Sequence, residues 1–214
     1  MKTASPRVAL VDYGAGNLRS VAKALERSAL TVDVTSDAAA VLRADAVVLP
    51  GVGAFAAAAA NLRAKGMDEA VAEAIDSGRP YLGLCLGLQL LFEDSDEHGT
   101  TRGLARFAGP VRRFPDESAG RPLRVPHIGW NEVHWSGEHP MLAGLPERDT
   151  YYFVHSYRAL PSDPSVSVGS CDYGGPFAAA VARANVFAVQ FHPEKSQNAG
   201  KRLLDAFAAW LRAR

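Results

Sequence analysis

Cys85 stands in a segment whose residues can turn a thiol into a nucleophile. The run GLCLG places a glycine two positions to either side of Cys85, between an apolar stretch and a stretch expected to be helical. A cysteine in an apolar run is most often a core residue. Here the glycines allow a sharp turn that projects the side chain above a sheet edge, as in elbows that carry serine. The following helix would favour the thiolate, with the N–H of Leu86 nearest to an oxyanion.

His192 and Glu194 supply a base and a carboxylate to orient it. Side chains two apart in an extended segment face the same side, and Pro193 pushes His192 toward the extended region. A His-Pro-Glu segment alone is most often a surface loop. Both this segment and Cys85 follow apolar strands, and the strand ends of an α/β sheet are where sites gather. We therefore predict a Cys85–His192–Glu194 triad, with Gln89 on the helical face of Cys85.

Several other chemistries lack their motifs in this sequence. The loop DYGAGNLRS follows a strand and opens a helix, but Arg19 stands where a dinucleotide-binding loop needs its third glycine. The chain has no phosphate-binding loop ending in Gly-Lys-Ser/Thr, no HExxH motif and no cluster of Cys and His. We therefore expect no nucleotide, no cofactor and no metal.

The composition narrows the kinds of partner and the cellular compartment that we expect. The 214 residues carry 23 basic and 23 acidic side chains, so charge gives no reason to expect nucleic acid or an anionic membrane. Two cysteines cannot form a disulfide framework, which suggests a reducing, cytoplasmic compartment. The first residues lack the long apolar run of a signal peptide, and the apolar runs 46–60 and 81–92 are too short to span a bilayer. We expect a soluble protein.

The first half of the chain alternates β-rich runs with helical stretches, which indicates a parallel sheet covered on both faces. A further helix should begin directly after Cys85, and the second long helix should be broken near Gly66. The expected strands are 8–12, 31–35, 45–50 and 80–84, and the expected helices are 17–28 and 54–77.

The second half is richer in proline, glycine and short β runs. Its last two runs predict an antiparallel hairpin that turns near 183–185. A final helix over 199–212 places an apolar face toward the core through Leu203, Leu204, Phe207 and Trp210. We predict one α/β domain over 1–214, with a central, mostly parallel sheet flanked by helices and an antiparallel extension in the C-terminal half.

The motifs GLCLGLQ and QFHPEKS resemble those of the class I glutamine amidotransferases. More narrowly, the chain is similar to the glutaminase subunits of imidazole glycerol phosphate synthases. That similarity rests on segments found in family order along essentially the entire chain: VDYGAGNLRSV, LPGVGAF, PHIGWNEV, YYFVHSYR and FHPEKSQNAGKRLL. GxCxGxQ identifies only the broad class, whereas DYGxGN together with PHxGWN is much more specific.

The resemblance implies a chemistry and a fold, the class I glutamine amidotransferase fold. Cys85 would attack the side-chain amide of glutamine, His192 would protonate the leaving ammonia, and water would then release glutamate from a thioester. The implied oxyanion hole uses backbone N–H groups of Leu86, Val52 and Gly53. Glu97 would suit the α-ammonium group of glutamine, although a solvated acid at a helix end is the alternative. The positions that resemble the substrate pocket are Gln89, Glu97, His155, Ser156 and Tyr157.

The resemblance also implies a partner. Family members form a heterodimer with a (βα)8-barrel cyclase subunit, which receives ammonia through an internal tunnel. The synthase, a lyase, makes imidazole glycerol phosphate and aminoimidazole carboxamide ribotide in histidine biosynthesis. Asn17, Trp130 and Lys195 match positions that face this partner, although a lone tryptophan is more often a core residue. Cys171 has no motif around it and is interpreted as structural.

Other interpretations stay open at this point. The glutaminase subunit of pyridoxal phosphate synthase also serves a barrel, but it has a Gly-Gly-Glu-Ser segment where this chain has LPGVGAF. Anthranilate and carbamoyl phosphate amidotransferases share GxCxGxQ without DYGxGN or PHxGWN. A binding module that kept the fold without activity, or a cysteine peptidase with a similar elbow, are the remaining alternatives. His98, His134 and His139 are interpreted as loop or surface residues.

Overall fold

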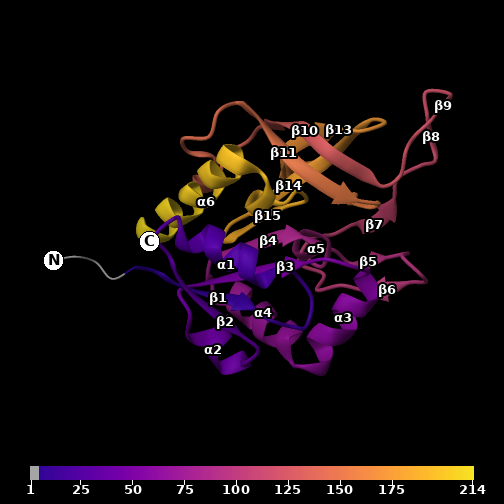
Figure 1. The fold of residues 1–214 in the computed structure, drawn as a ribbon. Helices are drawn as coiled ribbons and strands as arrows, with labels where there is room; N and C mark the ends of the chain where they lie inside the picture. Colours follow the sequence, from indigo (N-terminus) through magenta and orange to yellow (C-terminus); the bar gives the residue numbers. More distant parts are fainter. Residues whose placement is uncertain (1–4) are drawn as a thin grey trace.

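The computed structural model describes residues 5–214, and within them a nine-stranded sheet joins the two halves of the chain (Figure 1). Its order is β11-β10-β13-β14-β15-β4-β3-β1-β2, in which β15, β4, β3, β1 and β2 are parallel. The predicted domain begins at residue 1, and residues 1–4 lie outside the described part. The parallel strands are β1 (Arg7–Val11), β2 (Thr31–Thr35), β3 (Ala46–Gly51), β4 (Tyr81–Cys85) and β15 (Val186–Val189). The antiparallel strands are β10 (His127–Trp135), β11 (Arg148–His155), β13 (Ser167–Asp172) and β14 (Pro176–Arg183).

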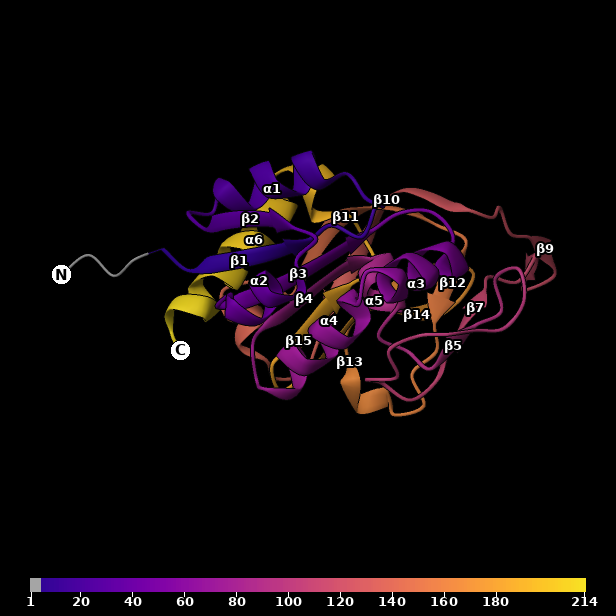
Figure 2. The same cartoon turned by 90° about the horizontal axis from the view of Figure 1, so that it is seen from below.

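Helices cover both faces of the parallel strands, as Figures 1 and 2 show. Alternate side chains of these strands enter two separate hydrophobic cores: Val8 and Leu10 pack in one, Ala9 and Val11 in the other. This division follows from the two-residue repeat of a strand that is buried on both sides. One face is covered by α1 (Leu18–Glu26) and α6 (Gln197–Arg212), the other by α2 (Ala38–Arg43), α3 (Phe55–Ala64) and α4 (Met67–Asp76).

The main sequence predictions about elements are confirmed. The expected break near Gly66 separates α3 from α4, and Gly66 has the left-handed φ of 63° that suits glycine. Strands β14 and β15 form the expected antiparallel hairpin, with Arg183 paired to Val186 across the turn. The apolar face of α6 is buried as predicted. None of the helices in residues 5–214 is both long and apolar enough to cross a membrane.

Two helices differ from the expectation. Helix α2 was missed, although Asp37 accepts a hydrogen bond from the N–H of Ala39 in the manner of an N-cap. The helix after Cys85, α5 (Leu86–Gln89), is only four residues long. The helix does not continue, because the carbonyl groups of Leu90 and Leu91 accept hydrogen bonds from backbone N–H groups of the loop 104–107. A helix needs those carbonyl groups for its own next turn.

A second, four-stranded sheet in the described residues was not predicted. Its order is β12-β7-β5-β6, and it carries the segments that lead to Glu97 and Tyr157. A two-stranded hairpin, β8–β9, projects away from the body of the molecule (Figure 1). The strands are β5 (Asp94–Ser95), β6 (Thr101–Arg102), β7 (Pro110–Arg113), β8 (Glu117–Ser118), β9 (Arg121–Pro122) and β12 (Tyr157–Ala159).

The turn from β4 into α5 depends on two glycines. Cys85 has a φ of 54°, which is unusual for a residue other than glycine and costs on the order of 1–3 kcal/mol. A Cβ on Gly83 would lie 2.6 Å from the carbonyl oxygen of Gly87, and a Cβ on Gly87 would overlap the carbonyl oxygen of Leu49. The two glycines therefore let α5 lie directly against β3 and β4 and hold Cys85 in its strained conformation.

This packing predicts the effect of adding one methyl group. Gly87→Ala should lower the free energy of unfolding by about 3 kcal/mol, because the new Cβ meets rigid backbone. Gly99→Ala is the control, since Gly99 has open space around it and only its positive φ resists the change, and should cost only about 1 kcal/mol. Urea denaturation of both variants checks this, and equal losses would contradict the proposed packing.

Candidate active site

The carboxyl ends of three adjacent parallel strands meet where Cys85 lies. Gly51 at the end of β3 pairs with Cys85 at the end of β4, and β15 pairs with β4 on its other side. The chain leaves β15 and reaches His192 three residues later. Because parallel strands deliver their carboxyl ends to the same edge, residues far apart in sequence are brought together there.

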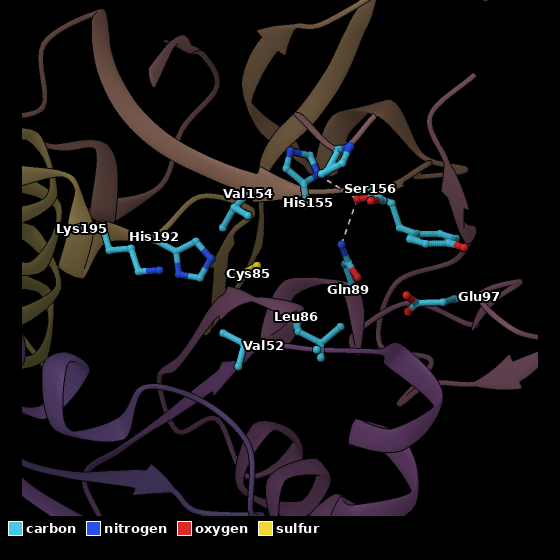
Figure 3. Close-up of a pocket in the computed structure, with 13 residues that line it drawn as sticks. Val52, Cys85, Leu86, Gln89, Glu97, Val154, His155, Ser156, His192 and Lys195 are labelled. Atoms are coloured by element: carbon cyan, nitrogen blue, oxygen red, sulfur yellow. Dashed lines mark hydrogen bonds between the residues drawn. The ribbon is translucent and has the colours of Figure 1, made fainter. Parts of the chain in front are cut away.

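The imidazole of His192 lies between Glu194 and Cys85. Its Nδ1 is 2.8 Å from Oε1 of Glu194, and both side chains are buried. Within the described residues Nε2 makes no hydrogen bond, and Figure 3 shows the ring beside the sulfur of Cys85. A carboxylate only accepts hydrogen bonds, so Nδ1 carries a proton and Nε2 is left for the sulfur.

The segment that holds this pair is not extended as the sequence argument assumed. His192 is extended, but Pro193–Lys195 form a 3-10 turn, with proline at its first position. Ser196 stabilises the turn: its hydroxyl donates to the carbonyl of His192 at 2.6 Å and accepts from the N–H of Tyr152 at 3.0 Å. The turn, rather than a two-residue repeat, brings Glu194 back to His192.

The charges around His192 favour its protonated form. Burial lowers the pKa of His192, but the neighbouring Cys85 and Glu194 raise it by more, so that the pKa lies above its usual value. The imidazolium therefore persists at neutral pH beside the sulfur. This arrangement can hold a thiolate and can also give a proton to a leaving group.

A cavity of about 300 Å³ opens in front of Cys85 (Figure 3). This volume suits a small metabolite. The structure brings all five predicted substrate-pocket residues and the predicted oxyanion-hole residues to its wall. Lys195, which was predicted at a partner surface, also lines it. The predicted residues in the wall are Val52, Gly53, Cys85, Leu86, Gln89, Glu97, His155, Ser156, Tyr157, His192 and Lys195.

Glu97 borders the cavity and supports a helix at the same time. Its Oε2 accepts a hydrogen bond of 2.6 Å from the N–H of Phe55, the first residue of α3. The alternative of an acid at a helix end holds in part, because the carboxylate caps a helix distant in the sequence, but it is half-buried rather than fully solvated. Helix α3 follows directly from the loop of Gly51, Val52 and Gly53, so Glu97 fixes one end of that loop.

Two residues at the site were missed by the sequence argument. Gln190 is fully buried, and its Nε2 lies 3.6 Å from the sulfur of Cys85. The two-residue spacing between Gln190 and His192 could have indicated it. Tyr13 is the other: its buried hydroxyl, unpartnered in the described residues, lies where a Cβ on Gly51 would meet it. Burial and the nearby Cys85 raise the pKa of Tyr13.

The predicted partner residues are at the surface. Trp130 on β10 is 48% exposed, so the alternative of a core residue is wrong. Its ring contacts Tyr152 edge-on, and Nζ of Lys195 lies 5.8 Å from the centre of the Tyr152 ring. Asn17 is exposed at the start of α1.

The remaining cysteine and histidines lie away from the cavity. Cys171 is buried in the core, and burial, with a contribution from Asp172, raises the pKa of its thiol to about 12. A thiol that stays protonated is chemically inert, which agrees with a structural role. His98 and His134 are exposed, and His139 accepts a hydrogen bond that begins a 3-10 turn.

Two neutral histidines support the wall of the cavity. Nδ1 of His127 lies 3.0 Å from Nε2 of His155, whose Nδ1 lies 2.8 Å from the carbonyl oxygen of Tyr157. Burial lowers the pKa of His127 to about 4 and, as the largest cause, that of His155 to about 3. Both rings are therefore neutral at pH 7.

The chain matches the family described as Glutamine amidotransferase class-I over residues 9–209. It is 51% identical over 209 residues to imidazole glycerol phosphate synthase subunit HisH of Methylococcus capsulatus, covering 95% of this chain and 96% of that protein. The subunit of the same name from Syntrophotalea carbinolica is 48% identical over 202 residues, covering 94% and 98%. Among solved structures, one described as a glutamine amidotransferase aligns with a TM-score of 0.72 at 17% identity, covering 96% of this chain and 99% of that one. PurLQS from Thermotoga maritima aligns with a TM-score of 0.68 at 19% identity, covering 97% and 99%.

The histidine pair predicts a loss of stability in acid. Between pH 6.5 and 4, His127 and His155 become protonated in the unfolded chain but stay neutral in the folded chain. The free energy of unfolding therefore falls as the pH is lowered through this range. His127→Asn keeps a donor at the place of Nδ1 but removes one such group. From pH 6.5 to 5 it should lose about 1–2 kcal/mol less stability than the unmutated chain.

Urea denaturation at the two pH values measures this difference. His98→Asn is the control, because an exposed histidine binds protons alike in both states and should leave the loss unchanged. An identical loss in His127→Asn and the unmutated chain would show that His127 is not held neutral by burial.

Proposed function

The chain belongs to the class I glutamine amidotransferase family, and we propose that it works there as the glutaminase subunit of an imidazole glycerol phosphate synthase. It hydrolyses glutamine to glutamate and ammonia and acts with a cyclase subunit in histidine biosynthesis. The buried His192–Glu194 pair beside Cys85, at the floor of a cavity, carries the proposal. We treat residues 1–214 as one such domain, because the family match runs over 9–209.

The first half of the reaction needs a nucleophile and an acid. The Cys85 thiolate attacks the side-chain carbonyl carbon of glutamine, and the carbonyl oxygen takes up the negative charge. Backbone N–H groups of Leu86, Val52 and Gly53 are proposed to stabilise that oxyanion. As the tetrahedral intermediate collapses, the carbon–nitrogen bond breaks and His192 protonates the leaving nitrogen, which gives ammonia and a thioester on Cys85.

The second half reverses the role of His192. Now neutral, its Nε2 takes a proton from water, and the resulting hydroxide attacks the thioester carbonyl. The carbon–sulfur bond then breaks, which releases glutamate and restores the thiolate and imidazolium. Glu194 keeps Nδ1 protonated throughout and so holds the ring in the orientation that both steps need.

Selection of glutamine is proposed to rest on polar groups in the cavity wall. Nε2 of Gln89 already donates to the carbonyl of Tyr157 at 2.9 Å and to Oε1 of Gln190 at 3.0 Å. Gln89 therefore offers only its oxygen to a substrate, which suits a donor group. Glu97 is the carboxylate in the wall that would pair with the α-ammonium group.

The partner surface is proposed to be the exposed face around β10 and β11. Ile128 is 59% exposed and Trp130 48%, and both lie on the same side of β10. An exposed tryptophan beside a lysine-covered tyrosine is typical of interface anchors. We propose that a (βα)8-barrel cyclase binds here as a heterodimer, and that Lys195 reaches from this surface into the cavity.

A covalent label tests the nucleophile. A glutamine-analogue electrophile should modify Cys85 in the complex with the cyclase, and free glutamine should protect against it, because both occupy one cavity. Peptide mapping by mass spectrometry locates the label. Cys85→Ala should lose the label and at least about 10³-fold of the ammonia release.

Cys171→Ala is the matched control. Its buried, protonated thiol is a poor nucleophile, so this variant should be labelled as fast as the unmutated chain. Labelling of Cys85→Ala at an undiminished rate would show that another residue is the nucleophile.

The loop of Gly51, Val52 and Gly53 predicts activation by the partner. Gly53 has a φ of 93° and open space around it, so the loop has more than one backbone arrangement available. A partner that binds one arrangement shifts the population toward it. Ammonia release should therefore rise at least about tenfold when the cyclase and its ribotide substrate are added, as a coupled glutamate assay measures. Equal rates with and without the liganded cyclase would exclude this coupling and leave the chemistry intact.

A further inference from the structure

The backbone carbonyl of Tyr157 fixes the direction of a chain of hydrogen bonds. Its oxygen lies 2.9 Å from Nε2 of Gln89 and 2.8 Å from Nδ1 of His155 (Figure 3). A carbonyl oxygen can only accept hydrogen bonds, so both partners must donate. This single acceptor therefore determines which atom of Gln89 is nitrogen and which nitrogen of His155 carries its proton.

One arm of the chain leads to the nucleophile. The same Nε2 of Gln89 lies 3.0 Å from Gln190, and because Gln89 donates, Gln190 must contribute its Oε1. The amide nitrogen of Gln190 is then on the other side, 3.6 Å from the sulfur of Cys85. An N–H group that has no other partner assigned in this network points at the reacting atom.

The other arm leads to the surface. Because Nδ1 of His155 donates, its Nε2 accepts, and the atom that faces it at 3.0 Å is Nδ1 of His127. Nε2 of His127 then accepts from the side-chain amide of Asn131 at 3.4 Å. Both rings are neutral, as this sequence of donors and acceptors requires. All the donors and acceptors from Asn131 to Cys85 are thus consistent with one orientation.

We propose that Gln190 is a further catalytic residue, whose amide N–H donates to the sulfur of Cys85 and stabilises the thiolate. The proposal rests on Cys85 being the nucleophile of the proposed function. A hydrogen bond to the charged form of a group favours that form, and Gln190 is fully buried, so water does not compete for its N–H. Gln89 and the Tyr157 carbonyl act as positioning groups, because they prevent the Gln190 amide from turning its oxygen toward the sulfur.

Gln190 differs from the other groups around Cys85 in having no titration of its own. Replacing Gln190 should therefore shift the pH at which the Cys85 thiolate forms, but it should leave the number of ionisations in the pH profile unchanged. The ionisable groups that face the sulfur or line its cavity are His192 with Glu194 behind it, Lys195, Glu97, His155, Tyr157 and Tyr13.

The test measures thiolate formation apart from turnover. In the complex with the cyclase subunit, the rate of Cys85 alkylation by iodoacetamide is followed against pH, without glutamine. Gln190→Met keeps the length of the side chain but has no N–H, and should move the midpoint upward by about one pH unit. It should lower kcat at least about tenfold and change KM less than about threefold, because glutamine binding uses other groups.

Two comparisons separate this role from a structural one. Gln89→Met has no N–H for Oε1 of Gln190 and adds no charge, so the Gln190 amide is free to turn, and the midpoint should rise as in Gln190→Met. Adding Gln89→Met to Gln190→Met should give no further rise. Gln197→Met is the matched control, since Gln197 is exposed on α6 and its loss should leave the midpoint unchanged.

The alkylation midpoint and kcat of these variants decide whether Gln190 acts on Cys85. A folded Gln190→Met complex with its midpoint within 0.2 pH units, roughly the precision of the method, and kcat within about twofold would overturn the proposal. If Gln190→Met does not fold, an unshifted midpoint in Gln89→Met overturns it and a raised one supports it. A wild-type complex without glutaminase activity would defeat the proposed function, while a midpoint shift in Gln190→Met would still support the N–H···S bond.

Discussion

The strained backbone of Cys85 is the constraint on which the rest of the site depends. A φ of 54° at a residue with a side chain persists only where the surroundings leave no alternative. Gly83 and Gly87 provide those surroundings, since they let α5 lie in backbone contact with β3 and β4. The sulfur consequently stands above the sheet edge, where the chain leaving β15 brings His192 to it. Without this packing the thiol would be one more buried cysteine, as Cys171 is.

Next to Cys85 the site combines one charged pair with neutral polar groups, while Lys195 and Glu97 stand elsewhere in the cavity wall. His192 is held protonated by Cys85 and Glu194, whereas burial keeps His127 and His155 neutral. The difference follows from partners: His192 lies between Cys85 and Glu194, whereas the other two rings hydrogen-bond to each other, to a backbone carbonyl and to an amide. Neutral donors and acceptors orient groups without disturbing that charge balance.

The sequence predicts the parallel strands, the break at Gly66 and the final helix because each has a strong local signal: an apolar run, a glycine or a helical repeat. The small sheet was missed because strands of two to four residues are too short to show a repeat. The early end of α5 depends on hydrogen bonds from the loop 104–107, which no local pattern reveals. The residues of the cavity wall followed from motifs, whereas the contact of Gln190 with Cys85 depends on how two amides turn in space.

Glu97 links the cavity to the start of α3. The carboxylate is already engaged as the cap of α3, and α3 begins where the loop of Gly51, Val52 and Gly53 ends. If Glu97 also meets the ammonium group of glutamine, as proposed, the substrate and the helix share one anion. Binding of glutamine would then alter the hydrogen bond between Glu97 and the start of α3. Because α3 follows the loop that carries the proposed oxyanion hole, substrate binding would also change how firmly that loop is held.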